Sequence, residues 1–222
     1  MTVDRLPRGP HGLEREDVLA SQRRRIFRAA LDCVAENGFA GTSIAAIVAG
    51  AGVSRRSFYE LFADKVDCVG AALDFAYESL ATLLVAAFDA SDSQTPRDVI
   101  GVFYRAYLEI LADRPSTARA LHVELPSTAE LASRRESISQ SFAARICETH
   151  RHGLERGEMS PVDPGVFDFV VGGVDDQIRR CILMRGPTDL PSLAPLLTHS
   201  TLMLLGDHRT ATSERSGGTE PE

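Results

Sequence analysis

Two scarcities in the 222-residue sequence limit what the protein can be. The four cysteines, Cys33, Cys68, Cys147 and Cys181, are scattered without a C-x-x-C pair, which argues against both a zinc knuckle and a disulfide framework. No uninterrupted apolar run approaches the ~20 residues that span a bilayer, and the N-terminus lacks the apolar core of a signal peptide. We therefore expect a cytoplasmic protein with reduced thiols, no metal site and no membrane partner.

The sequence also lacks the common motifs of catalysis. It has no G-x-S-x-G elbow, no H-E-x-x-H pair, no Walker-type loop and no dinucleotide fingerprint after a strand. A reaction would depend on scattered acids and histidines, so we expect neither an enzyme nor a cofactor. His150 and His152 suggest a metal pair, but residues two apart on a helix point to different sides, which favours a solvated face.

Lysine is almost absent, because Lys65 is the only lysine among 24 basic residues. The net charge of −7 opposes DNA binding at first sight, since phosphates attract cations. However, residues 1–65 carry ten basic against eight acidic side chains, whereas residues 66–222 carry fourteen against twenty-three. The basic end is therefore the candidate nucleic-acid surface, with Arg23-Arg24-Arg25 expected to open its first helix. A preceding arm with Arg5 and Arg8 is either a further DNA contact or a disordered tail.

Residues 41–62 are expected to form two short helices joined by a glycine turn. Thr42 is predicted to cap the first helix, and Gly52 to end it in the left-handed conformation. Ser54 then caps a second helix, in which two phenylalanines four residues apart point to the core. The outward polar side chains would suit phosphates and base edges in a major groove; these candidates are Thr42, Ser43, Ser54, Arg55, Arg56, Ser57 and Tyr59.

An ordinary helical hairpin with a solvated polar face is the alternative to DNA binding. The caps, the Ala51-Gly52-Val53 elbow and the two arginines agree with one another, which favours the DNA-binding interpretation. Lys65 begins the next helix after a predicted Asp64 cap, so its ammonium group and the helix N-terminus both favour a phosphate. An exposed surface charge is the alternative for Lys65.

From Arg25 to Lys65, and more loosely from Glu14 to Leu73, the sequence resembles the N-terminal domain of the TetR family of bacterial transcriptional regulators. The resemblance is carried by Ile26, Ala30, Glu36-Asn37-Gly38-Phe39, Thr42, Ile47, Ala51-Gly52-Val53-Ser54, Phe58-Tyr59, Phe62 and Lys65. It implies contacts with the DNA backbone or groove at Ser54, Arg55, Arg56, Ser57, Tyr59 and Lys65. Val48, Arg56 and Glu60 depart from the family's usual residues; the first bears on the helix crossing, the other two on the bases read.

Beyond Lys65 the sequence keeps a helical period and shows neither a strand signal nor an internal repeat. Apolar residues step by three and four from Val66 to Phe88, which predicts a long helix between two domains. Further helices are predicted over 97–113, 115–126, 127–156, 164–185 and 195–205. The expected fold class is all-α: a three-helix helix-turn-helix DNA-binding domain (1–65), a helical effector-binding and dimerisation domain (66–206) and a disordered tail (207–222).

Two apolar stripes, within 163–185 and 194–206, are candidate dimerisation helices. Gly172 and Gly173 remove side chains from the first stripe, which allows close approach of a neighbour and fits a four-helix interface between subunits, as the resemblance also implies. Internal core is the alternative for both stripes. A homodimer would read both halves of a palindrome, because one DNA-binding domain reads only a few base pairs.

Aromatic and polar residues on the later helices indicate an apolar pocket with polar anchors, for which Tyr104, Tyr107, His122 and Gln177 are candidates; plain core is the alternative. We therefore predict a homodimeric transcriptional repressor that binds a palindromic DNA operator and is released by a small lipophilic effector. An effector-independent DNA-binding protein, such as an architectural factor or a recombinase-type head, is the alternative. The large acidic, apolar-rich helical domain favours the regulator that responds to an effector.

Overall fold

The computed structural model describes residues 15–91 and 95–207, and the regular structure within these ranges is helical, which confirms the all-α class. The α-helices are Arg15–Gly41 (α1), Ile44–Ala51 (α2), Arg55–Tyr59 (α3), Lys65–Asp89 (α4), Pro96–Ala112 (α5), Pro115–Arg119 (α6), Ala132–Glu155 (α7), Gly165–Met184 (α8) and Ala194–Leu204 (α9). The connections contain a π-helical turn, Ala120–Glu124 (η1), and 3-10 turns at Leu125–Ser127 (η2), Ala129–Leu131 (η3) and Pro187–Leu193 (η4).

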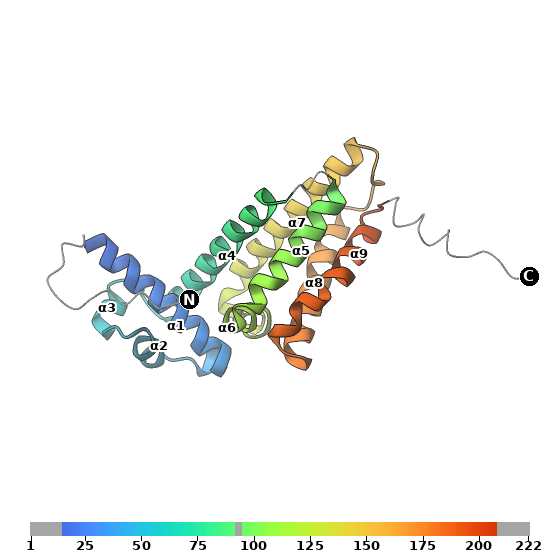
Figure 1. Ribbon diagram of the computed structural model, residues 1–222. Coiled ribbons are helices and arrows are strands. Elements are labelled where there is room, and N and C mark those ends of the chain that lie inside the picture. Colours follow the sequence, from blue (N-terminus) through green and yellow to red (C-terminus); the bar gives the residue numbers. More distant parts are fainter. Residues whose placement is uncertain (1–14, 92–94, 208–222) are drawn as a thin grey trace, which may run out of the picture.

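The molecule is elongated, with α1, α2 and α3 forming a head at one end and α5 to α9 forming a bundle at the other (Figure 1). Ile26, Ile47 and Phe58 are fully buried in the head, because each of its helices turns an apolar face toward the other two. α1 is interrupted at Gly38, whose φ of 69° is left-handed. The expectation that residues 23–25 open the first helix is wrong, since α1 already runs through them from Arg15.

Helix α4 joins the head to the bundle, as predicted for a long helix from Lys65 to Phe88. The Asp64 carboxylate caps it by accepting the Asp67 N–H at 2.9 Å, and its 25 residues extend over about 37 Å. Among the described residues, α4 alone is long and apolar enough as a whole to cross a bilayer. Its apolar face is nevertheless buried against α1 and α5, with Leu73 and Leu84 among the core residues.

The bundle follows the predicted helices within a few residues, except in two places. The segment expected to be one short helix after Pro115 is divided into α6, η1 and η2, and η4 precedes α9. The disordered tail was predicted to begin at residue 207, which is too early in the sequence. Asp207 is buried, and its carboxylate accepts a hydrogen bond from Arg97 Nη2 at 2.5 Å. The arm with Arg5 and Arg8, and the tail from 208 to 222, lie outside the described residues.

Candidate DNA-binding surface and effector cavity

The turn between α2 and α3 is built by serine caps and one glycine. Ser43 Oγ accepts the Ala46 N–H at 3.1 Å, and Ser54 Oγ accepts the Ser57 N–H at 3.0 Å. Gly52 ends α2 with φ 62° and ψ 41°, a left-handed conformation that glycine adopts at little cost. The predicted roles of Gly52 and Ser54 are therefore confirmed.

Thr42 does not cap α2. Its side chain is buried, and Oγ1 donates to the Gly38 carbonyl oxygen at 2.8 Å. The same carbonyl oxygen also accepts the Thr42 backbone N–H at 3.1 Å, while Ser43, one residue later, takes the capping position. A direct DNA contact through the Thr42 side chain would require this hydrogen bond to break.

Helix α3 presents an open polar face. Arg55, Arg56 and Tyr59 are exposed, Tyr59 to 57%, whereas Phe58 is fully buried behind them. Arg56 Nε lies 3.1 Å from Glu60 Oε1, but both side chains are exposed. Such surface pairs contribute about 0–1 kcal/mol, so the guanidinium can leave Glu60 for a base edge or a phosphate at little cost.

Lys65 has a structural partner that its sequence position did not reveal. Its Nζ donates to the Phe39 carbonyl oxygen at 2.8 Å and lies 4.3 Å from the centroid of the Phe39 ring. The ammonium group is half-buried, so the alternative of a merely exposed charge is wrong. Two of its three N–H donors remain for a phosphate.

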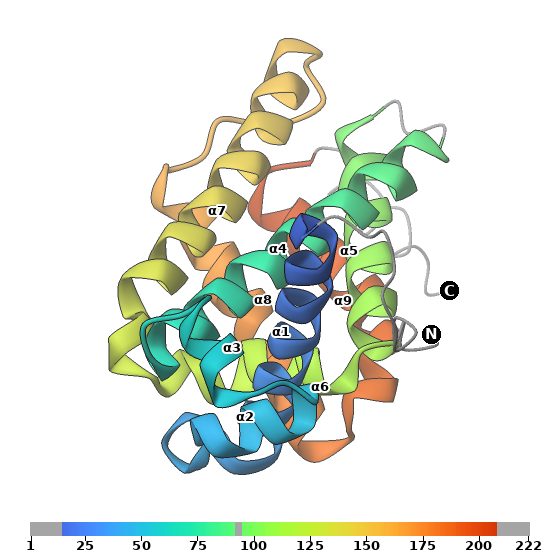
Figure 2. The same ribbon diagram turned by 90° about the vertical axis from the view of Figure 1, so that its left-hand side faces the viewer.

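A cavity of about 1110 Å³ lies in the bundle, lined by α4, α5, α7, α8 and η1. Figure 2 shows α7 on one side of α4 and α8, with α5 and α9 on the other. Much of the wall is apolar, including Leu80, Leu84, Phe88, Ile100, Phe103 and Phe142.

Three of the four candidate effector anchors, Tyr104, Tyr107 and His122, line this cavity. Gln177 does not, because it lies two residues after the cavity-lining Asp175 and is rotated about 200° around α8 to another face. The expectation that Gln177 joins the other anchors is therefore wrong.

A chain of hydrogen bonds runs along the inner wall of the cavity. His122 Nδ1 lies 2.7 Å from Asp175 Oδ1, and His122 Nε2 lies 3.1 Å from the Tyr107 hydroxyl. A neutral imidazole that donates from Nδ1 to the carboxylate accepts the Tyr107 proton at Nε2. Elsewhere on the wall, the hydroxyls of Tyr104 and Thr201 lie 2.7 Å apart. Asp175 was not among the predicted anchors.

The phenols of the cavity stay protonated. Burial raises the pKa of Tyr104 to about 12, although its hydrogen bond with Thr201 acts in the opposite direction. Burial also raises the pKa of Tyr107, and the nearby Tyr77 and Asp175 raise it further. These hydroxyls are therefore hydrogen-bonding groups rather than charges near neutral pH.

Residues 26–72, which contain the helix-turn-helix, match the model of the bacterial regulatory proteins of the tetR family. The resemblance to this family that the sequence predicts is thus confirmed over the head. The head is therefore the DNA-binding domain of a transcriptional regulator, as predicted. Comparison with curated protein sequences found no match.

Solved structures of tetR-family regulators share the whole fold. The fatty acid degradation regulator FadR from Bacillus halodurans is 19% identical over 92% of this chain and 99% of its own, with a TM-score of 0.72. FadR from Bacillus subtilis, in complex with stearoyl-CoA, is 21% identical over 83% and 99% of the two chains, with a TM-score of 0.70. A TetR-family regulator from Marinobacter aquaeolei VT8 is 21% identical over 88% and 100%, with a TM-score of 0.65.

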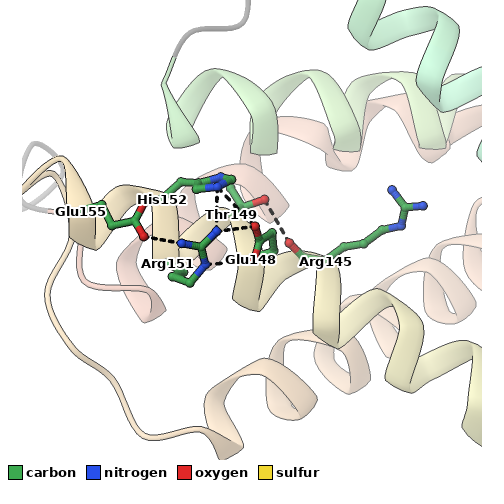
Figure 3. Close-up of polar contacts among 6 residues, drawn as sticks. All are labelled: Arg145, Glu148, Thr149, Arg151, His152 and Glu155. Atoms are coloured by element: carbon green, nitrogen blue, oxygen red, sulfur yellow. Dashed lines mark hydrogen bonds and ion pairs between the residues drawn. The ribbon is translucent and has the colours of Figure 1, made fainter.

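The outer part of the cavity carries a network of charges on α7 (Figure 3). Arg151 pairs with Glu148, at 2.6 Å, and with Glu155, and the hydrogen bond from Arg151 lowers the pKa of Glu148. His152 Nε2 lies 3.2 Å from Glu148 Oε1, whereas the Arg145 side chain extends away from the group. The rim is therefore largely neutralised by its own ion pairs.

His150 and His152 have different environments, as expected for residues two apart on a helix. His152 is exposed, but His150 is buried, with Nε2 2.9 Å from the Ser160 carbonyl oxygen. The expectation of a solvated face is therefore wrong for His150. Within residues 15–91 and 95–207, no cluster of three histidine, cysteine, aspartate or glutamate side chains could hold a metal ion.

The two C-terminal stripes are divided between core and surface. Ile178, Cys181, Ile182 and Leu197 are buried within the bundle. Other apolar side chains are open to solvent, including Phe169 at 67% and Met184 at 82%, together with Leu183, Leu196, Met203 and Leu204. A Cβ atom added at Gly173 would meet nothing within 4 Å. An exposed apolar surface of this kind is typical of a protein interface.

Proposed function

We propose that the protein is a cytoplasmic homodimeric repressor that binds a palindromic operator through α3 and is released by a small lipophilic effector in the bundle cavity. The observation that carries the DNA-binding part is the outward face of α3. Two arginines and a tyrosine stand exposed on a short helix that Ser54 caps, with a buried phenylalanine holding it to the head. Such a helix inserts into a major groove and leaves its arginines free for guanine edges.

Dimerisation through α8 and α9 is proposed from the exposed apolar side chains on both helices. Phe169 and Leu196 are too large to be left in water without a partner surface, and Gly173 leaves room for a second helix. A two-fold pair would place two α3 helices on successive turns of one DNA face, which is the geometry of a palindromic site.

The effector part of the proposal follows from the cavity. A volume of about 1110 Å³ with a mostly apolar wall and a few polar groups is the usual form of a small-molecule site. The FadR structure from Bacillus subtilis, of similar fold, is in complex with stearoyl-CoA, which supports a long apolar ligand for this architecture. We infer that a ligand between α4 and α7 shifts α4, whose first residue lies against the head, and so moves the two heads out of register.

The proposed function can be tested by measuring operator binding after both exposed arginines of α3 are removed. Operator DNA selected from a random library by the full-length protein should lose its specific binding to an Arg55→Ala/Arg56→Ala variant, since each bidentate base contact contributes roughly 1–3 kcal/mol. Helicity and dimer mass should not change, because both side chains are exposed. Arg105→Ala, an exposed arginine on α5, is the matched control and should bind as the wild type does. Retained affinity in the double variant would show that α3 is not the reading helix.

A further inference from the structure

One carboxylate oxygen faces the cavity without a protein partner. Asp175 Oδ1 is bonded to His122 Nδ1, but Oδ2 has no hydrogen-bond partner among the described residues. The Asp175 side chain is 37% exposed, and the residue lines the cavity. A carboxylate in this position is an acceptor open to whatever occupies the cavity.

A phenolic hydroxyl lies near the same carboxylate. Tyr77, on α4, lines the cavity, and its hydroxyl makes no hydrogen bond with the part of the chain that the structure describes. Tyr77 and Asp175 line the same cavity, and the charge of Asp175 adds to burial in raising the pKa of the Tyr77 hydroxyl. Tyr107, the third polar group here, is already hydrogen-bonded to His122 Nε2.

Three arginines line the cavity, Arg135, Arg145 and Arg156, and Arg135 is the one whose charge acts on Tyr77. It lines the cavity from α7 and lowers the pKa of Tyr77, but its side chain is exposed and therefore well solvated. An exposed guanidinium gains little from an anion, whereas the Asp175 carboxylate is partly shielded, is already held by His122 and has one oxygen without a protein partner. The acceptor, not the cation, is thus the stronger recognition group.

We propose that the cavity selects a lipophilic molecule that carries a hydrogen-bond donor, an alcohol or a protonated amine, received by Asp175 Oδ2 and the Tyr77 hydroxyl. The inference rests on the proposed effector site and names its ligand class. A lipophilic carboxylate is disfavoured there, because it would bring a second negative charge beside Asp175 without a proton to share. In this respect the site differs from one built for an anionic head group.

Three ligands of equal chain length test the selection: 1-decanol, decylamine and decanoate, titrated calorimetrically into the full-length protein at pH 7.5 without DNA. A hydrogen bond to a charged acceptor predicts that the alcohol and the amine bind roughly 10–100-fold more tightly than decanoate. Asp175→Asn keeps the size of the side chain and removes its charge, so it should bring the three affinities within a few-fold of one another. Asp168→Asn, an exposed cavity-lining acid two turns earlier on α8, is the control and should keep the wild-type order.

A second variant guards against a folding defect in Asp175→Asn. Tyr77→Phe retains the partly buried ring and removes only the hydroxyl, so the affinity for decanol should fall several-fold while the cavity stays intact. Equal or tighter binding of decanoate by the wild type overturns the inference. Loss of that decanoate binding in Arg135→Gln would then identify an anion site. Failure of all three ligands to bind overturns it as well.

Operator release separates this inference from the proposed function. If the alcohol and the amine bind in the expected order but leave operator affinity unchanged, the ligand class is right and the inducer role is wrong. If only decanoate releases the operator, the inducer role is right and the ligand class is wrong.

Discussion

Arg119 Nε donates to the Ala35 carbonyl oxygen at 2.9 Å, so a side chain from α6 of the bundle closes onto the backbone of α1 in the head. The same guanidinium pairs with Glu124 at 3.0 Å across the π turn η1. His122 projects from the middle of that turn into the cavity. Arg119 and the turn that follows it therefore join the DNA-binding domain to the candidate effector site.

Arg119→Ala should weaken the junction between the two domains. It removes a charged donor from the Ala35 carbonyl oxygen, and we expect the free energy of unfolding to fall by about 1–2 kcal/mol. Urea denaturation followed by circular dichroism measures this change. Glu124→Gln keeps the bond to Ala35 and removes only the partly exposed ion pair, so it should cost less. Equal losses in the two variants would assign the effect to the ion pair.

Lys65→Ala should reduce the dependence of operator binding on salt. Loss of one phosphate contact predicts a log-log salt slope smaller by about one and a similar weakening for all operator variants. Because Lys65 also holds the Phe39 carbonyl oxygen, the thermal stability of the variant must be measured beside its affinity. Tyr59→Phe, which removes no charge, should weaken binding with the slope intact. An unchanged slope in Lys65→Ala would restrict this residue to its structural role.

Gly173→Arg should yield monomers. A Cβ atom at this position meets nothing within 4 Å in the subunit, so the fold should tolerate the change, whereas a dimer would bury an unpaired charge. Light scattering at micromolar concentration gives the mass. Ala144→Arg, on the exposed side of α7, is the control and should remain dimeric. A dimer of normal stability in Gly173→Arg would place the interface on another surface.

Operator DNA and effector should weaken each other's binding by the same factor. Thermodynamic linkage requires this reciprocity, and the factor is typically ~5–150 for allosteric proteins. Decylamine titrated into the protein with and without bound operator provides the measurement, with operator affinity measured in the presence and absence of decylamine as its counterpart. Equal affinities in the two titrations would show that decylamine is no inducer, and tighter binding with DNA present would make it a co-repressor.

Local signals in the sequence were sufficient to predict most of the helices, caps and turns of the head. Gly52, Ser54 and Asp64 lie where a turn or a cap is needed, and each acts within three residues of its own position. The long α4 could be predicted because its apolar residues recur at helical spacing. Thr42 was misplaced by one residue, since Ser43 beside it caps equally well and the interruption at Gly38 supplies Thr42 with another acceptor.

The cavity could be predicted only in part, because its polar groups meet through tertiary contacts. His122 and Asp175 are 53 residues apart, and no local pattern marks them as partners. Gln177 is as polar as the candidates that line the cavity, but its angular position on α8 depends on which face packs inward. The contact of Lys65 with Phe39 likewise joins residues 26 apart across two helices.

The separation of charge between the two ends of the molecule has a consequence for its encounter with DNA. The chain up to Lys65 carries a small positive excess and the remainder a large negative one, and the head and the bundle lie at opposite ends of the elongated molecule (Figure 1). Such a molecule has an electric dipole along its length. In the field of a nucleic acid it rotates before contact, with the recognition helix leading and the acidic bundle repelled to the far side. The charge of the bundle would thus help to orient the head, although the bundle lies at the far end of the molecule.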